Sequence, residues 1–274
     1  MAGAGGARRA PTPPPGHASP CDCTKGAETV TLRFYAELND FLAPLDRGHP
    51  LTFSFYTPVP VKDAIEGLGV PHTEVDLILV NGESVDFSHP LRDGDRVSVY
   101  PVFESIDISP VLRVRPKPLR EIRFLADTHL GRLAAYLRLM GFDTVYGHNA
   151  GDRDLAQRAS EERRILLTRD RGLLMRSAVT HGYWLRQTNP RLQLREVLER
   201  FDLASSVAPF TRCLRCNTPL AAASRQEVAG RLPPGIEQKY EEFQLCLGCG
   251  RIYWEGSHHR RMSDLVAATL SPRP

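Results

Sequence analysis

Short apolar runs alternate with helix-spaced apolar residues in the second half of the chain. The runs at residues 122–126, 142–146, 164–168 and 182–185 have the length and apolar character of buried strands. Between the first two runs, apolar residues recur every three or four positions, as on one helix face: Leu130, Leu133, Ala134, Leu137 and Met140. Further helices are predicted at residues 154–162 and 192–201. This order predicts a three-layer α/β/α domain with a parallel sheet over residues 120–206.

The first half of the chain has a different pattern, with more strands than helices. Strands are predicted at residues 29–35, 51–55, 77–80 and 96–100, and a short helix at 61–67. The pair Asn81-Gly82 is a hairpin turn signal directly after the third strand. We therefore expect a small α+β domain over residues 29–104.

The remaining segments are predicted from composition. Residues 1–28 are rich in Ala, Gly, Pro and Arg, lack the apolar core of a signal peptide, and are expected to form a disordered tail. Prolines interrupt residues 105–119, which are expected to be a linker. Residues 263–274 are expected to be a C-terminal tail. No apolar run approaches the length of a membrane span, so we expect no membrane partner and a cytoplasmic location.

The net charge of +3 hides a change of sign along the chain. Residues 29–104 hold 5 Lys/Arg and 12 Asp/Glu, whereas residues 105–274 hold 27 Lys/Arg and 18 Asp/Glu. Most of the basic residues are Arg, which grips phosphate and stacks on bases, so RNA is an expected partner. A genome rich in GC would also favour Arg codons. The acidic domain is expected to dock on a protein partner.

Three aspartates are the candidates for chemistry. Asp127 directly follows a predicted strand, Asp170 follows another, and Asp152 precedes a predicted helix. Ligands of open parallel sheets bind at the carboxyl ends of the strands, where a divalent cation offsets the cost of burying a carboxylate. Mg²⁺ or Mn²⁺ held by these aspartates indicates phosphodiester chemistry. Each aspartate can equally be a helix N-cap.

The cysteines carry the most specific motif. Cys213 and Cys216 form one C-x-x-C pair, Cys246 and Cys249 form a second, and 29 residues separate the pairs. Four thiolates hold Zn²⁺ tetrahedrally with no open position, so the spacing predicts a structural zinc ribbon over residues 207–262. Two disulfides or free thiols are the alternatives.

Aromatic and basic residues follow the second cysteine pair. Tyr253 and Trp254 lie a few residues before Arg260 and Arg261. Such a mixture can stack bases and hold phosphates. It is also compatible with the last strand of the ribbon followed by a solvated helix.

These residues resemble a known family. The segments Phe124-Leu125-Ala126-Asp127 and Ile165-Leu166-Leu167-Thr168-Arg169-Asp170-Arg171, with the two cysteine pairs, resemble the PIN-like ribonucleases named for the C-terminal domain of the Mut-seven exonuclease. The resemblance implies a PIN-like sheet, a zinc ribbon and a metal-dependent ribonuclease. Asp127, Asp152 and Asp170 stand at acidic positions of that family, where PIN nucleases usually gather four acidic residues.

The N-terminal segment resembles ubiquitin-like β-grasp sulfur carriers, through Val80-Asn81-Gly82 and Asp93-Gly94-Asp95-Arg96-Val97. Those carriers act through a free C-terminal Gly-Gly. Here the last strand continues into Pro101-Val102-Phe103-Glu104, so we expect docking or regulation and not sulfur carriage.

The sequence thus predicts an endonucleolytic ribonuclease in which aspartate-held Mg²⁺ or Mn²⁺ activates water. Arg132, Arg169 or Arg171 is expected to neutralise the scissile phosphate. The competing hypothesis is a non-catalytic RNA-binding adaptor that uses the ribbon and the Arg-rich surface.

Overall fold

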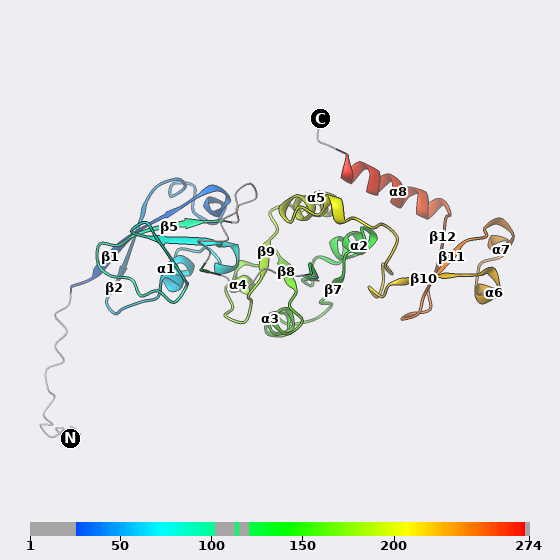
Figure 1. Cartoon of the computed structure of the whole chain (residues 1–274), viewed down its shortest axis with the longest axis horizontal. Helices are drawn as coiled ribbons and strands as arrows, with labels where there is room; N and C mark the ends of the chain where they lie inside the picture. Colours follow the sequence, from blue (N-terminus) through cyan, green and yellow to red (C-terminus); the bar gives the residue numbers. More distant parts are fainter. Residues whose placement is uncertain (1–25, 102–112, 115–120, 272–274) are drawn as a thin grey trace, which may run out of the picture.

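The chain forms three units in a row, shown from blue to red in Figure 1. The computed structural model describes residues 26–101, 113–114 and 121–271. The expected tail at residues 1–28 lies outside the described residues except for its last three, and so does nearly all of the expected linker at 105–119.

The N-terminal unit is a mixed five-stranded sheet with one α-helix. Its elements are β1 (Glu28–Phe34), the 3₁₀ helix η1 (Ala36–Phe41), β2 (Leu51–Phe55), α1 (Val61–Gly67), the 3₁₀ helix η2 (His72–Glu74), β3 (Leu77–Val80), β4 (Glu83–Val85) and β5 (Arg96–Tyr100). The strand order is β2-β1-β5-β3-β4, and only β1 and β5 are parallel. Alternating residues of β1, including Leu32 and Phe34, are buried in a core with Ile65 of α1. The predicted β-grasp fold is confirmed.

The central unit is a parallel sheet between helices. It contains β6 (Phe124–Ala126), α2 (Gly131–Leu139), β7 (Thr144–Tyr146), α3 (Asp152–Glu161), β8 (Ile165–Thr168), α4 (Arg171–Leu174), β9 (Gly182–Trp184), α5 (Pro190–Arg200) and the 3₁₀ helix η3 (Ala204–Ser206). All four strands are parallel in the order β7-β6-β8-β9. Phe124 and Leu167 pack with α2 and α5, whereas Leu125 and Leu166 pack with α3 and α4. Both faces are therefore covered, which confirms the three-layer prediction.

Helix ends in the central unit follow their local sequence. Asn189 caps α5 by accepting a hydrogen bond from the Arg191 N–H, and Pro190 occupies the first turn. Gly141 follows α2 with a φ of +95°, and a Cβ there would lie 2.3 Å from the Ala208 carbonyl oxygen. Only glycine fits both conditions, so this residue ends the helix and lets the chain before the ribbon approach it.

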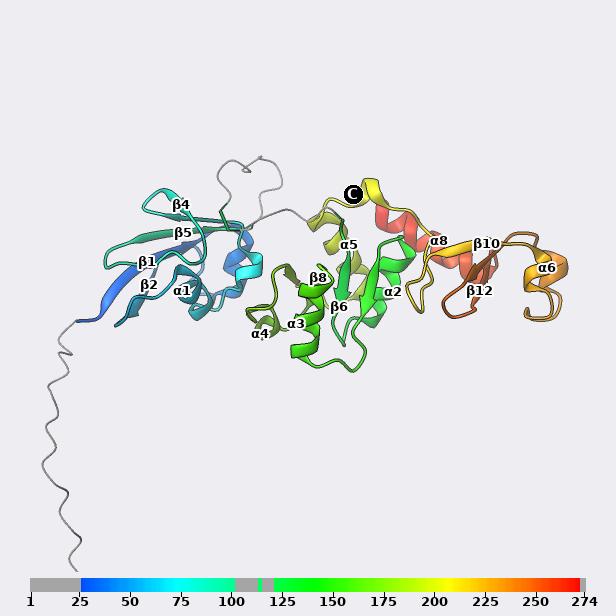
Figure 2. The same ribbon diagram turned by 60° about the horizontal axis from the view of Figure 1, so that its bottom comes forward.

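The C-terminal unit is a small antiparallel sheet with a long helix. It contains β10 (Leu220–Ala223), α6 (Arg225–Val228), α7 (Ile236–Lys239), β11 (Phe243–Cys246), β12 (Ile252–Trp254) and α8 (Ser257–Leu270). Figures 1 and 2 show α8 running back from the ribbon toward α5. Within the expected tail at 263–274, residues 263–270 are instead part of α8, and Leu265 and Val266 are buried in the core of the central unit. Burial of this apolar pair holds the segment in a helix.

Side-chain hydrogen bonds, including those of Arg138 and Asn217, attach the ribbon to the central unit. Buried Arg138 on α2 donates from Nη1 to the carbonyl oxygens of Leu214 and Arg215, both at 2.9 Å. Asn217 accepts from the Thr144 N–H at the start of β7 and donates to Asp143. The first cysteine pair therefore lies against the amino-terminal end of β7. No helix among the described residues is long and apolar enough to span a bilayer.

Candidate functional site

Asp127 lies at the carboxyl end of β6 with only 8% of its surface exposed. Its Oδ2 accepts a hydrogen bond of 2.7 Å from Thr168 Oγ1, and its Oδ1 accepts from the N–H and hydroxyl of Thr128. These three donors orient the carboxylate and offset the cost of its burial. Asp127 caps no helix, since α2 begins four residues later with Leu130 at its N-cap.

Asp170 follows β8, the strand next to β6. It is the N-cap of α4, with Oδ1 accepting from the N–H groups of Gly172 at 2.8 Å and Leu173 at 3.4 Å. The capping alternative therefore holds for this aspartate. Among the described residues, Oδ2 of Asp170 has no hydrogen-bond partner, so the cap leaves one carboxylate oxygen available to another ligand.

Thr168 links these two aspartates. Its hydroxyl donates to Asp127 Oδ2 and accepts a hydrogen bond of 2.9 Å from the Asp170 N–H. Thr168 is fully buried as the last residue of β8. Sequence reasoning missed this residue; its position at the end of a strand, two residues before Asp170, was the signal available.

Asp152 stands apart from this pair. It is the first residue of α3, whose N-cap is Gly151, so it is not a cap. Its exposed carboxylate forms an ion pair of 3.5 Å with Arg176, which follows α4. The three aspartates do not bring ligand atoms within 4.8 Å of one another, because in the described part of the chain only the four cysteines do so. Hydrogen bonds through Thr168 thus join the Asp127 carboxylate to the backbone of Asp170, and Asp152 lies outside this chain of bonds.

The basic side chains near this edge differ in their surroundings. Arg132 and Arg169 are exposed. Arg171 instead lies at the contact with the N-terminal unit. Its guanidinium is 5.0 Å from the ring centroid of Phe41 in that unit and 4.3 Å from that of Trp184 at the end of β9. It also donates to the carbonyl oxygens of Asp40 and Phe41. Arg171 is therefore occupied in the contact between the two units.

Arg260 and Arg261 are both exposed near the start of α8.

The four cysteines converge in the ribbon. Cys216 Sγ lies 3.3 Å from Cys246 Sγ, and Cys213 Sγ lies 3.6 Å from Cys249 Sγ. Disulfide sulfurs are about 2.05 Å apart, so no bridge is present among these four. Tetrahedral zinc with Zn–S bonds of about 2.3 Å places its sulfurs about 3.8 Å apart. The cluster is compatible with structural zinc.

The two cysteine pairs differ in their acidity: hydrogen bonds lower the pKa of Cys213 and Cys216, whereas the pKa of Cys246 and that of Cys249 are raised. Burial opposes ionisation of Cys216, but its hydrogen bonds with the hydroxyl and the backbone of Thr218 lower the pKa of Cys216 to about 6. At Tyr253, burial and the neighbouring Cys213 raise the pKa, so the hydroxyl stays protonated and lies 3.1 Å from Cys213 Sγ. Thiolates are the form that binds zinc.

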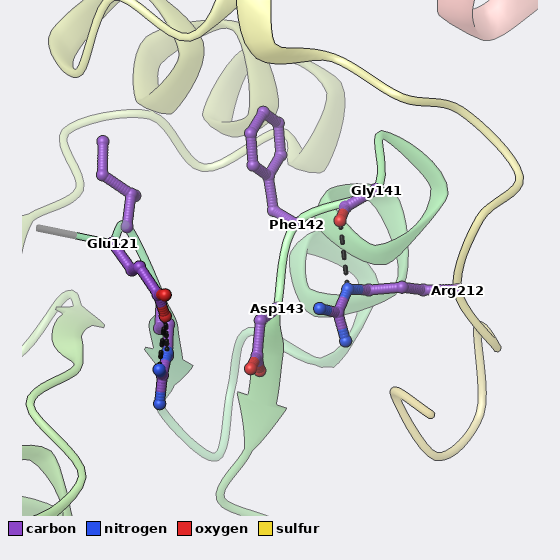
Figure 3. Close-up of a pocket in the computed structure, with 7 residues that line it drawn as sticks. Glu121, Gly141, Phe142, Asp143 and Arg212 are labelled. Carbon is purple, nitrogen blue, oxygen red and sulfur yellow. Dashed lines mark hydrogen bonds and ion pairs between the residues drawn. The ribbon is translucent and has the colours of Figure 1, made fainter. Parts of the chain in front are cut away.

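A hollow of about 340 Å³ lies at the amino-terminal ends of β6 and β7, opposite to the strand ends that carry Asp127 and Asp170 (Figure 3). Its charged side chains already have partners within the chain. Arg123 pairs with Glu121, and Arg212 donates to the Gly141 carbonyl oxygen at 3.0 Å. Asp143 accepts from Arg164 and from Asn217. Most of these residues precede β6 and β7, at the strand ends opposite to Asp127. Asp143 and Arg212 take part in the hydrogen bonds that join the ribbon to the sheet.

Comparison with protein families identifies two matches. Residues 122–266 match the Mut7-C RNAse domain, and residues 27–107 match the Mut7-C ubiquitin domain. A search of curated proteins found no relative of the chain.

Proposed function

Because the chain belongs to the family of the Mut7-C RNAse domain, which matches residues 122–266, we propose that it is a metal-dependent endoribonuclease. The observation that carries the proposal is the arrangement Asp127–Thr168–Asp170 across the ends of β6 and β8. Two carboxylates at neighbouring strand ends, one buried and one with a free oxygen, are suited to a hard divalent cation.

The chain's own residues have separate roles in this proposal. Thr168 fixes the orientation of Asp127, so that the oxygen lone pairs not used by Thr168 and Thr128 point to the ligand. Asp127 and Asp170 would hold Mg²⁺ or Mn²⁺, which would supply an activated water and stabilise charge on the scissile phosphate. Exposed Arg132 and Arg169 attract the RNA backbone. Asp152 contributes from the start of α3 after release from Arg176.

We propose that the four cysteines hold one structural zinc, which orders the ribbon as a platform for RNA. The acidic N-terminal unit docks on the central unit within the same chain: Asp40 pairs with Arg186 at 2.9 Å and Glu37 with Arg200 at 3.6 Å. It keeps Arg171 and the end of β9 in a fixed position beside Asp170.

A non-catalytic RNA-binding adaptor is the second candidate. The observation that favours it is the cap made by Asp170, which gives this aspartate a structural role without any metal. Incubating the full chain with single-stranded RNA, with and without Mg²⁺ or Mn²⁺, separates the two. Cleavage that requires the metal supports the ribonuclease, and RNA binding without any cleavage supports the adaptor.

A further inference from the structure

A hollow of about 690 Å³ lies between the ribbon sheet and α8, within the range typical of ligand pockets. One wall is the sheet face that carries Ala222, Gln244 and Tyr253, which are neighbours in the register of β10, β11 and β12. The opposite wall includes Phe210 and His259, whose rings stack with centroids 4.1 Å apart. Ala222 contributes only a methyl group to this wall.

The aromatic wall on the sheet is held in place before any ligand arrives. The Tyr253 hydroxyl lies 3.1 Å from Cys213 Sγ and accepts from the Leu214 N–H at 3.2 Å. Both bonds tie the ring to the first cysteine pair. A ring fixed in this way loses little conformational entropy when a flat ligand stacks on it.

The polar groups of the hollow suit the edge of a base. Gln244 is half-buried, and its amide makes no hydrogen bond with any other described residue. The carboxylates of Glu242 and Glu255 lie at the exposed rim and only accept hydrogen bonds. These carboxylates repel phosphate from the hollow itself. Positive charge is available nearby, since residues 207–262 hold 8 Lys/Arg and 5 Asp/Glu. The basic residues include Arg212, which also lines the hollow, and exposed Arg260 and Arg261, which do not line it.

We propose that this hollow is a base-binding subsite for single-stranded RNA, with the base inside and its phosphates on the basic surface outside. The inference rests on the proposed ribonuclease function and gives that function a second RNA contact. The subsite is separate from the aspartates, because the ribbon lies against the amino-terminal end of β7 whereas Asp127 follows the carboxyl end of β6. The rim carboxylates favour bases with an amino group, so cytosine binds better than uracil.

The test is RNA binding by the zinc-loaded full chain carrying Asp127→Asn, so that the RNA stays intact. Fluorescence anisotropy with labelled oligocytidine and oligouridine of about eight nucleotides gives the affinities. Ala222→Leu fills the hollow and should weaken oligocytidine binding about tenfold, the scale of losing one stacked base. The salt dependence should keep its slope, because no phosphate contact is removed. Gln226→Leu, an exposed change on α6 outside the hollow, is the matched control and should bind like the parent.

His259→Ala removes part of the opposite wall and provides an independent variant if Ala222→Leu fails to fold. Wild-type affinity in both variants, with equal binding of the two oligonucleotides, would overturn the proposal. A second result would also overturn it: Ala222→Leu weakens the binding of a Lys/Arg-rich peptide but leaves RNA binding unchanged. The hollow would then be a docking site for a protein. Metal-dependent cleavage by the wild type is measured separately. It shows whether the ribonuclease proposal holds even if the binding data contradict the base-binding subsite.

Discussion

The Glu74 side chain accepts a hydrogen bond of 2.6 Å from the backbone N–H of Trp184, across the contact between the N-terminal and central units. Trp184 ends β9, the edge strand of the parallel sheet. An uncovered edge strand offers its backbone to other chains. Nearby, His72 Nε2 lies 2.8 Å from the Val179 carbonyl oxygen, on the segment that leads into β9. The ubiquitin-like unit therefore covers this edge with side chains from η2.

Removing Glu74 should destabilise the contact. Glu74 is buried, so Glu74→Ala leaves the Trp184 N–H without its acceptor and should lower the free energy of unfolding by about 1–3 kcal/mol. Urea unfolding checks the value, and Glu83→Ala, an exposed change in the same sheet, is the control. Unchanged hydrogen-exchange protection of the Trp184 amide in Glu74→Ala would contradict this role.

Arginines in different surroundings should respond differently to salt. Double substitution of Arg260→Ala and Arg261→Ala should reduce the slope of log K against log salt for RNA by roughly one to two. Arg171→Ala should leave that slope unchanged and lower stability, since Arg171 binds Asp40 and Phe41 oxygens. RNA titrations between about 50 and 200 mM salt measure the slopes. A reduced slope in Arg171→Ala would place this residue on the RNA surface.

Zinc should be necessary for the ribbon and not for the N-terminal unit. We expect one zinc per freshly purified chain and loss of it in Cys216→Ser. Zinc supplies about 10–16 kcal/mol of apparent folding free energy in small finger peptides, and the ribbon buries few apolar residues of its own. Hydrogen exchange in Cys216→Ser should rise across β10–β12 while β1–β5 keep their protection. Elemental analysis without zinc, or a ribbon that stays protected in this variant, would exclude the site.

Stability should fall in acid partly through Asp143. Partial burial raises the pKa of Asp143, but hydrogen bonds from Arg164 and Asn217 outweigh burial and hold this pKa below 3.8. A carboxyl group whose pKa is lower in the folded state than in the unfolded state stabilises the fold at pH values above its unfolded pKa. This stabilisation is lost as the pH falls through its folded pKa. Asp143→Asn should therefore be less stable near neutral pH and lose less stability below about pH 4. Urea unfolding midpoints of the wild type and of Asp143→Asn across this pH range test the prediction. An equal loss of stability in acid in the two proteins would show that Asp143 is not the group responsible.

Most strands of the first two units, three helices of the central unit and the cysteine cluster were predictable, because hydrophobic period and C-x-x-C spacing are local features. The role of Thr168 was not predictable, since a threonine at the end of a strand can link Asp127 and Asp170 only when β6 and β8 pair. The surroundings of Arg171 depend on Phe41, which is distant in sequence. The helical course of α8 past residue 262 depends on burial of Leu265 against the central core. The resemblance named the family, and the two matched domains confirm it.

The central claim is that Asp127 and Asp170 hold a catalytic metal. Asn keeps the capping ability of Asp but is a poor ligand for a hard cation, so Asp170→Asn separates the two roles. The direct measurement is the rate of Mg²⁺- or Mn²⁺-dependent cleavage of single-stranded RNA by Asp127→Asn and Asp170→Asn. Asp154→Asn, an exposed change in α3, is the control. We predict that both variants stay folded and lose cleavage while the control retains it; wild-type cleavage in both would show that these aspartates serve the fold alone.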